Sequence, residues 1–358
     1  MGGRTGGPLT PILAMASQLP YTPIVIEVPG GYGDTLGRHK GLKVLHLPQT
    51  KLSSLSFGLS LAALIEVPIQ FLRLLYATCL SMYYLLKFKP IGVLGAGGFT
   101  TVPMAIALRI LRLIGLPTKL VVHQQDPLIG LANKISLRLA DKGTYVWDCS
   151  SSISYTKKLR KIPNPIEFEK FNPEVISRLA NKFPELNSFI TSSDKPILLV
   201  FGGGSGAKSI NEWVVRSIDD LADTFRIIHL SGVLQEYSLP EIDSQNYFRM
   251  EYAIEEMPLL LVKSDLVLCR AGLGSISELL YLNKPAVLVP IPNSHQEINA
   301  QVAKDYFAIY EQEKNDDWTT TLSTSYPQFF HTLSHLDPVT YREQLCNFYF
   351  DLEQFLEK

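Results

Sequence analysis

Short runs of aliphatic and β-branched residues alternate along this chain with longer segments whose apolar residues recur at helical spacing. This alternation is typical of strand–helix–strand units, which form parallel sheets covered by helices. The predicted strands are Ile24–Ile26, Lys43–Leu47, Ile91–Leu94, Lys119–Val122, Thr144–Trp147, Ile197–Phe201, Arg226–Leu230, Leu266–Leu268 and Ala286–Val289. The pattern therefore predicts an α/β fold.

A polar stretch separates the first five strands from the last four. It begins at Ile162–Pro165 and contains no predicted strand up to about Lys195. Prolines and polar residues without strands are typical of an inter-domain connection, and a length of 358 residues suits two domains. We predict an N-terminal domain over residues 1–165, a second domain over 166–337 and a C-terminal packing helix over 338–358.

Three glycine-rich segments precede predicted helices: Gly2–Gly7, Gly95–Gly98 and Gly202–Ala207. Glycine lets the backbone approach a ligand closely, and a helix N-terminus offers N–H groups to a phosphate or sugar oxygen. A tight turn between a strand and a helix also favours glycine, so each segment alone fits either role. Because both halves share this design, we expect two doubly wound sheets facing a ligand cleft.

The first glycine segment is unusual because no strand precedes it. Such a segment normally follows a strand, yet only Met1 stands before Gly2. Either the recorded start lies downstream of the true one, or the first strand is missing, and we favour the first explanation.

The segment after Leu266–Leu268 is the most informative one. Its glycines open a helix without obstructing side chains, which makes Arg270–Ser275 a candidate seat for a diphosphate. Glu278 lies about one turn into this helix, where its carboxylate could accept hydrogen bonds from two ribose hydroxyls. Ser275 and Glu278 also fit a capping box, in which Glu278 would serve only the helix end. The local sequence leaves both interpretations open.

Polar residues also follow two other strands. His295 and Gln296 come just after Ala286–Val289, and His123–Asp126 follows Lys119–Val122. Residues at the carboxyl ends of parallel strands are placed to contact a ligand. The alternatives are a surface role for His295 and a helix-capping role for the second cluster.

Composition narrows the class of protein. The chain has 46% hydrophobic residues, 19% charged residues and a formal net charge of −1, which fits a globular protein and gives no reason to expect a nucleic-acid partner. Its four cysteines show no zinc-ligand or disulfide spacing, and the N-terminus lacks the pattern of a signal peptide. We therefore expect a cytoplasmic protein without a metal ion or a cofactor.

The most apolar part of the chain is residues 57–88. Glu66, Arg73 and Lys87 interrupt it, and its longest uncharged run, Leu74–Leu86, is shorter than the roughly 20 residues of a spanning helix. We expect that this stretch does not cross a bilayer.

Together these motifs resemble those of the MurG family of N-acetylglucosaminyltransferases. The matching segments, in family order from Gly2 to about Gln301, are GGRTGGPLTPILAMASQL, VLGAGGFTTVP, HQQDPLIGLANK, NPI, FGGGSGAKSIN, CRAGLGSISELLYLNKPAVLVPIP and HQEINAQ. The resemblance implies a GT-B fold with two Rossmann-like domains. It also implies inverting transfer of N-acetylglucosamine from UDP-GlcNAc to the C4 hydroxyl of the muramoyl sugar of lipid I, at the inner face of the plasma membrane.

The resemblance assigns roles to individual positions. It places Glu278 on the ribose, the Gly272–Gly274 backbone and Ser275 on the diphosphate, the Ile254 backbone on uracil, and Gln296 with His295 on the GlcNAc hydroxyls. The full set of expected substrate-binding residues is Thr5, Gly6, Gly7, Gly97, Gly98, Asp126, Asn133, Gly204, Ser205, Ile254, Arg270, Gly272, Leu273, Gly274, Ser275, Glu278, His295 and Gln296.

Three positions depart from the family pattern. The histidine that ends the family's first glycine loop is Pro8 here, which cannot move a proton, and an arginine after the Asn-Pro motif is Glu167, which would repel a diphosphate. The family's asparagine in the HQQD segment is Asp126, whose carboxylate is a candidate replacement for the base. His123 and Asp34 are further candidates for that role.

The resemblance also gives the apolar stretch a role, because an acceptor on a polyprenyl carrier requires an enzyme at the membrane surface. We expect residues 57–88 to bind an anionic membrane through Leu72, Leu75, Tyr76, Cys79, Met82 and Tyr83 with nearby basic residues. The alternative is a buried domain helix. Two other functions remain open, namely a different lipid-directed GT-B transferase and an inactive UDP-sugar-binding protein.

Overall fold

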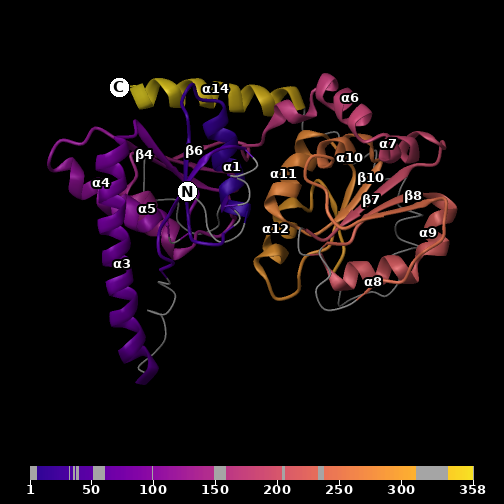
Figure 1. Cartoon of the computed structure of the whole chain (residues 1–358), viewed down its shortest axis with the longest axis horizontal. Coiled ribbons are helices and arrows are strands. Elements are labelled where there is room, and N and C mark those ends of the chain that lie inside the picture. Colours follow the sequence, from indigo (N-terminus) through magenta and orange to yellow (C-terminus); the bar gives the residue numbers. More distant parts are fainter. Residues whose placement is uncertain are drawn as a thin grey trace. The chain divides into compact units, whose positions relative to one another are not determined.

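The computed structural model describes residues 6–357 except 32, 35–36, 38–39, 51–60, 99, 149–158, 204–205, 233–237 and 312–337. The chain divides into two compact units (Figure 1). Unit 1 comprises the residues up to Ile166 together with those from Glu343 onward, and unit 2 is Glu167–Arg342. Each unit is an α/β assembly built around parallel strands.

Unit 2 contains one six-stranded parallel sheet with the strand order β12-β11-β10-β7-β8-β9. The strands are β7 (Ile197–Phe201), β8 (Arg226–Leu230), β9 (Tyr247–Met250), β10 (Leu266–Cys269), β11 (Ala286–Leu288) and β12 (Ala308–Ile309). Every residue of β7, β8, β10 and β11 is buried, because helices cover both faces of such a sheet. The sequence pattern predicts all four of these buried strands, although β8 carries two buried polar residues, Arg226 and His229.

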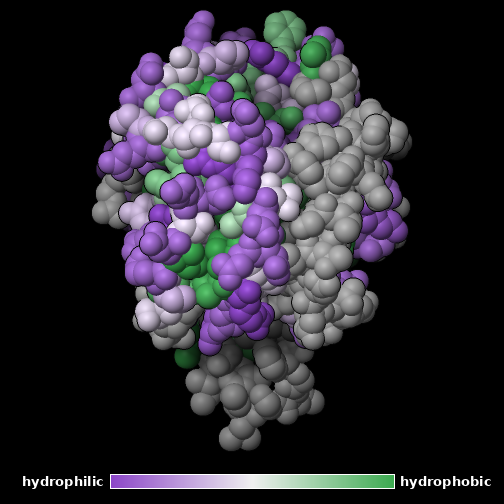
Figure 2. Space-filling view, turned by 90° about the vertical axis from the view of Figure 1, so that its right-hand side faces the viewer, coloured by the Kyte–Doolittle hydropathy of each residue, from purple (hydrophilic) through white to green (hydrophobic). Residues whose placement is uncertain are grey.

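Helices surround this sheet and supply the rest of the core of unit 2. They are η3 (Phe168–Phe171), α6 (Pro173–Lys182), α7 (Pro184–Thr191), α8 (Lys208–Arg216), α9 (Ile218–Thr224), α10 (Met257–Lys263), α11 (Leu273–Tyr281) and α12 (His295–Ala303). Trp213 of α8 and Phe225 after α9 pack with the strands in the main apolar cluster. The side that carries α8 and α9 is mostly hydrophilic in Figure 2.

Unit 1 contains two separate parallel sheets. Strands β1 (Ile24–Glu27) and β2 (Lys43–His46) form one of them, and the order β3-β4-β5-β6 describes the other. The strands of the second sheet are β3 (Gly92–Gly95), β4 (Lys119–Gln124), β5 (Lys142–Tyr145) and β6 (Leu159–Lys161), and the helices of unit 1 are α1 (Gly6–Ser17), α3 (Leu61–Phe88), α4 (Thr101–Arg112) and α5 (Leu131–Leu139). Helix α14 (Pro338–Glu357) is the predicted C-terminal helix, and its last 15 residues, Glu343–Glu357, belong to unit 1.

All nine predicted strands are present, with ends that differ by up to two residues. The pattern missed β6, β9 and β12. Strands β6 and β12 have only three and two residues, and no residue of β9 is fully buried. All three lie at the edges of their sheets, where one-sided burial leaves a weak hydrophobic signal.

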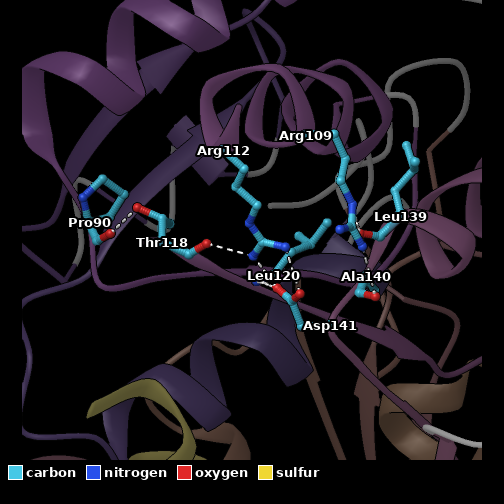
Figure 3. A network of polar contacts seen from close by, with 8 residues as sticks. All are labelled: Pro90, Arg109, Arg112, Thr118, Leu120, Leu139, Ala140 and Asp141. Atoms are coloured by element: carbon cyan, nitrogen blue, oxygen red, sulfur yellow. Dashed lines mark hydrogen bonds and ion pairs between the residues drawn. The ribbon is translucent and has the colours of Figure 1, made fainter. Parts of the chain in front are cut away.

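A polar network attaches α4 to the sheet of unit 1 (Figure 3). The Arg112 guanidinium pairs with both carboxylate oxygens of Asp141 and donates to the carbonyl of Thr118, while the Leu120 N–H donates to Asp141. Burial raises the pKa of Asp141, but hydrogen bonds from Arg112 and Leu120 outweigh that effect and lower the pKa below its usual value. The network fixes the end of α4 against β4 and β5.

Helix α3 has two different faces. Ala77, Ser81 and Leu85 are buried against unit 1, whereas Phe71, Leu72, Leu75, Tyr76, Tyr83 and Leu86 are exposed. Its N-terminal half extends away from the rest of unit 1 (Figure 1). Among the described helices, α3 alone contains a stretch, Val67–Phe88, of sufficient length and apolar composition to cross a membrane. The length argument from the short uncharged run does not hold, because these 22 residues with few charges meet the length requirement. That the stretch does not cross a bilayer stays a prediction.

Candidate functional site

The N-terminus of α11 is an open, unobstructed backbone surface in unit 2. Gly272 is the N-cap residue, no side chain caps the helix, and a side chain added at Gly274 would meet only open space. The N–H groups of Leu273, Gly274 and Ser275 precede the first intrahelical bond, which runs from Ile276 to Gly272. Three consecutive N–H groups at a helix start suit an anion such as a diphosphate.

Arg270 lies two residues before the N-cap Gly272 and contacts neighbouring segments of unit 2. Its guanidinium donates to the carbonyl oxygens of Val289 and Pro290, each at 3.2 Å, and to Ser209 Oγ at 2.9 Å. Partial burial lowers the pKa of Arg270. The side chain therefore joins the ends of β10 and β11 to α8. Its expected contact with the substrate stays a prediction.

Asn299 is a second positioning residue, which the sequence reasoning missed. Its side chain is buried in α12, and its amide donates to the carbonyl of Ala271 at 3.0 Å. This bond fixes the residue that immediately precedes the α11 N-cap. Asn299 lies four residues after His295 on the same helix. This spacing was the feature of the sequence that could have linked Asn299 to the site.

His295 and Gln296 begin α12, as the sequence pattern places them. Ser294 caps the helix by accepting a hydrogen bond from the Gln296 N–H, His295 is exposed, and Gln296 Oε1 accepts from the Ile291 N–H at 3.2 Å. Both residues lie beyond the carboxyl end of β11, in the same unit as α11.

Glu278 forms an ion pair with Lys170 of η3, with 2.5 Å between Oε1 and Nζ. The capping-box alternative does not fit, because α11 begins at Leu273 and Ser275 lies inside it rather than at its cap. Glu278 is about one turn past the open N–H groups, and its carboxylate is mostly buried. Sequence reasoning missed Lys170, which is 108 residues away in the chain.

The other predicted site residues of unit 2 are Ile254 and two residues of the glycine segment after β7. The Ile254 N–H lies 3.2 Å from the Glu256 carboxylate, and the Ile254 side chain is exposed. In the glycine segment after β7, Gly206 has φ +77°, and a side chain there would lie 2.3 Å from the Ser231 carbonyl oxygen, so this position requires glycine. Gly204 and Ser205 lie outside the described residues.

His123 is fully buried in unit 1, with both ring nitrogens engaged. Nδ1 lies 2.8 Å from Thr144 Oγ1 and Nε2 lies 3.0 Å from Asn164 Oδ1. Burial lowers its pKa to about 4. The contacts of His123 join β4 to β5 and to the Asn-Pro motif. Its role as a catalytic base stays a prediction.

Asn133 and Gly97 lie in direct contact at the carboxyl end of β3. Gly97 has φ +91°, and a side chain there would lie 2.6 Å from Asn133 Oδ1. The Asn133 amide donates to Gln124 Oε1, while its own Oδ1 is buried without a partner among the described residues. Gln124 also donates to the carbonyls of Asp126 and Leu128 and thereby shapes the HQQD loop.

The HQQD loop also approaches the start of α1. A side chain at Gly7 would lie 3.6 Å from Gln125 Nε2. Asp126 is partly exposed at the end of this loop. Pro8 lies within α1, Gly98 is next to Gly97, and Thr5 lies outside the described residues.

Two carboxylates at the end of β1 complete this part of unit 1. Asp34 accepts a hydrogen bond from the Gly30 N–H at 2.8 Å and pairs with His46 Nε2 at 2.6 Å. Glu27 is fully buried, accepts from the Val28 N–H, and has an Oε2 atom without a described partner. Burial raises the pKa of Glu27. The sequence analysis did not single out Glu27, because one polar residue at the end of a strand does not by itself indicate a site.

Comparisons with known proteins agree with these observations. Residues 197–324 match the glycosyltransferase family 28 C-terminal domain. A UDP-N-acetylglucosamine--N-acetylmuramyl-(pentapeptide) pyrophosphoryl-undecaprenol N-acetylglucosamine transferase of Vesicomyosocius okutanii is 30% identical over 312 residues, 85% of this chain and 81% of that protein. The chain belongs to this family, the MurG family.

One further relative is matched over less of its length, and two solved structures are matched over nearly all of theirs. Transferase 3 of Bacillus cereus is 35% identical over 233 residues, which is 64% of this chain and 61% of that protein. The crystal structure of Acinetobacter baumannii MurG is 20% identical, with a TM-score of 0.67 over 99% of this chain and 98% of that one. A Neisseria meningitidis UDP-GlcNAc 2-epimerase has a TM-score of 0.58 at 15% identity, with each chain covered completely. These structures show that the fold is GT-B, as the sequence predicts.

Proposed function

We propose that this chain transfers N-acetylglucosamine from UDP-GlcNAc to the C4 hydroxyl of the muramoyl sugar of lipid I and so produces lipid II. The observation that carries the proposal is the open N-terminus of α11 with the Glu278 carboxylate one turn away. Membership of the MurG family supports the identities of donor and acceptor. Single inversion needs no covalent enzyme intermediate.

The donor binds to unit 2. The diphosphate accepts hydrogen bonds from the N–H groups of Leu273, Gly274 and Ser275, and Glu278 accepts from the ribose hydroxyls. His295 and Gln296 contact the GlcNAc hydroxyls, since they begin a helix beyond the next strand. Because UDP leaves with increased negative charge, the same N–H groups stabilise the transition state more than the bound donor.

The acceptor binds to unit 1, near Gly7, Gly97, Asn133 and the HQQD loop. Asp126 accepts the proton of the acceptor hydroxyl, because Pro8 cannot do so and His123 is buried with both nitrogens occupied. Asp34 is the second candidate base, and its pairing with His46 gives it a route to pass a proton on.

The chain docks on the cytoplasmic face of an anionic membrane through α3. Leu72, Leu75, Tyr76 and Tyr83 form an exposed apolar face at helical spacing, Cys79 is exposed among them, and Met82 instead packs against the core. The opposite face of α3 is buried against α4 and the sheet, with Ala77 and Ser81 fully covered. Ser81 and the apolar residues beside it are buried against the rest of unit 1. Binding of α3 at the membrane surface therefore fits this helix better than insertion across the membrane.

A transfer assay tests the proposal. Radiolabelled UDP-GlcNAc is incubated with the chain, in parallel with a lipid I analogue, with diacylglycerol and without acceptor. Label in the lipid I product, reduced with the Glu278→Ala variant at a donor concentration below saturation, supports the proposal. Label only in diacylglycerol would establish a different lipid-directed transferase. Nucleotide binding without transfer to either acceptor would indicate an inactive UDP-sugar-binding protein.

A further inference from the structure

Helix α11 carries Glu278 and Tyr281 three residues apart, and residues at this spacing are neighbours on a helix surface. Glu278 pairs with Lys170 of η3. The Tyr281 ring lies against two rings of the same short helix, those of Phe168 and Phe171, with centroid distances of 6.4 and 5.8 Å. One face of α11 therefore contacts η3 both through an ion pair and through an aromatic ring.

Helix η3 holds its two phenylalanines on one side. In a 3₁₀-helix the side chains of residues i and i+3 are eclipsed, which lets Phe168 and Phe171 face Tyr281 together. Their exposed fractions are only 2% and 9%, so this packing belongs to the interior of unit 2. Lys170 precedes Phe171 in the chain, and its Nζ atom lies 5.0 Å from the centre of the Phe171 ring. A ring at this distance attracts the ammonium group.

The last residues of unit 2 complete this group of rings. Tyr341 packs edge-to-face against Tyr281 with 5.8 Å between the centroids, and the Arg342 guanidinium lies 4.8 Å from the centre of the Phe168 ring. We call Phe168, Phe171, Tyr281 and Tyr341 the aromatic cluster. Tyr281 is the member that contacts the other three, so its ring joins α11 to both ends of unit 2.

The orientation of Glu278 depends on where the backbone of Lys170 is held. Lysine is a mobile partner because its ammonium group stands on a long flexible side chain. The four residues of η3 are too few for a helix that is stable by itself, so packing against Tyr281 helps to fix the backbone from which Lys170 reaches Glu278. With Oε1 of Glu278 bound to Lys170, the carboxylate is fixed so that Oε2 can accept from ribose hydroxyls.

We propose that Tyr281 is a positioning residue of the proposed donor site. Its ring holds η3 against α11, so that Lys170 turns the Glu278 carboxylate towards the ribose. This role rests on the proposed function, in which Glu278 binds the ribose. It has a consequence for specificity: the aromatic cluster determines how strongly the site distinguishes a nucleotide with ribose hydroxyls from one without them. The diphosphate seat at the start of α11 does not depend on the cluster.

The affinities for UDP and for 2′,3′-dideoxy-UDP test this role, and calorimetry measures both without an acceptor. We expect the parent to bind UDP at least about tenfold more tightly than the dideoxy nucleotide, because the ribose hydroxyls donate to a charged acceptor. Tyr281→Leu should reduce this ratio at least about threefold by weakening UDP alone, since leucine keeps apolar volume but loses the ring contacts. Tyr281→Phe should keep the ratio, because phenylalanine retains the ring.

Phe189→Leu is the matched control. Phe189 and Phe248 form another aromatic pair of unit 2, with ring centroids 5.2 Å apart. Phe248 belongs to β9, which is separated from β10 and the helix that follows it by β7 and β8. This variant should lose stability and keep the ratio of the parent. A ratio reduced as much as in Tyr281→Leu would assign both effects to general destabilisation and would overturn the positioning role.

A double variant tests whether Tyr281 acts through Lys170. The effects of Tyr281→Leu and Lys170→Ala on the ratio should not add, because both variants remove the same orientation of Glu278. Additive effects, an unchanged ratio in Tyr281→Leu, or an equal loss in Tyr281→Phe would each overturn the positioning role. A parent that does not bind UDP, or does not distinguish the two nucleotides, would instead contradict the proposed donor site, and the role of Tyr281 would be rejected with it.

Discussion

Lys170 Nζ lies 2.5 Å from Glu278 Oε1, and this pair joins η3 to the helix that opens the candidate diphosphate site. Glu278 is the more buried partner, so its carboxylate depends on Lys170 for compensation. The Asn-Pro segment of this chain carries Glu167 where the family has an arginine, and Lys170 supplies a cation three residues later. Lys170 is therefore positioned to orient Glu278 and to add positive charge beside the proposed nucleotide site.

Glu278→Ala should weaken binding of UDP-GlcNAc by about 1–3 kcal/mol, roughly 5- to 150-fold, because ribose donors lose their acceptor. Isothermal titration calorimetry measures the affinity, and urea unfolding measures the stability of the same variant. Unchanged affinity with reduced stability would assign Glu278 a structural role only.

Lys170→Ala should lower UDP-GlcNAc affinity by roughly 3- to 30-fold, because a charge-assisted hydrogen bond that orients Glu278 is lost. Lys170→Arg should retain most of the affinity. Lys182→Ala is the matched control, since Lys182 pairs with Glu255 on the exposed surface of the same unit. An effect of Lys170→Ala that persists unchanged in the Glu278→Ala background would contradict the positioning role.

Asp126→Asn should leave UDP-GlcNAc affinity nearly intact and reduce turnover by about 10²- to 10⁴-fold, the usual contribution of a general base. Steady-state transfer to a lipid I analogue measures this effect, and Asp34→Asn provides the comparison. Loss of donor affinity would instead place Asp126 on the sugar. Turnover within a few-fold of the parent would exclude Asp126 from both roles and leave Asp34 as the candidate base.

Replacing Leu72, Leu75 and Tyr76 together by serine should reduce binding to anionic vesicles at least about tenfold, because each apolar side chain contributes on the order of 1 kcal/mol or more when buried. Binding of the parent should weaken as salt rises, since Arg73, Lys87 and Lys89 are exposed on or beside α3. Vesicle co-sedimentation measures both effects. Phe350→Ser on α14 is the control, as Phe350 is similarly exposed. Equal, negligible partitioning of the parent to anionic and neutral vesicles at low salt would refute membrane docking.

Stability should fall as the pH drops from about 6.5 towards 4. Burial lowers the pKa of both His123 and His229 to about 4, so below pH 6.5 the unfolded chain binds protons that the folded chain does not. The free energy of unfolding then decreases by roughly 1.4 kcal/mol per pH unit for each histidine. Urea unfolding at several pH values measures this slope, and NMR of the two imidazoles should show them neutral at pH 5.5.

The Glu27 carboxyl changes the free energy of unfolding with pH in the opposite direction to the two histidines. Its pKa is raised by burial, so its contribution is present below the ordinary value and is lost as the pH rises through the folded value. Glu27→Gln should therefore be at least as stable as the parent at neutral pH. A clear loss of stability at pH 7 would show that the Glu27 carboxylate is paired with a cation when folded.

The sequence predicted the buried strands well and the directions of side chains poorly. Ile197–Phe201 and Arg226–Leu230 have the bounds read from their apolar runs, because full burial leaves a continuous hydrophobic signal. Arg270 reads as a phosphate ligand beside glycines, yet its long side chain reaches back to Ser209 and two carbonyls. Only the spatial proximity of β11 and α8 determines that direction.

Helix starts were the other source of ambiguity. Ser275 and Glu278 fit a capping box by spacing, but Gly272 caps α11 three residues earlier and leaves Ser275 inside the helix. Lys170 could not be linked to Glu278 from sequence, because the contact joins segments 108 residues apart. Asn299 lay within a recognised motif, and its bond to Ala271 depends on how α12 packs against the end of β10.

The break between the two sheets of unit 1 also affects how copies of the chain behave towards one another. Among the described strands, β1 and β3 both end their sheets. An unpaired strand edge is a template for an extended chain, including that of a neighbouring molecule. Natural sheets protect such edges with charges, prolines or short strands, whereas the edge-lining residues here are mainly aliphatic. Wherever part of such an edge is unpaired, we expect self-association through it to compete with folding as the concentration of the chain rises.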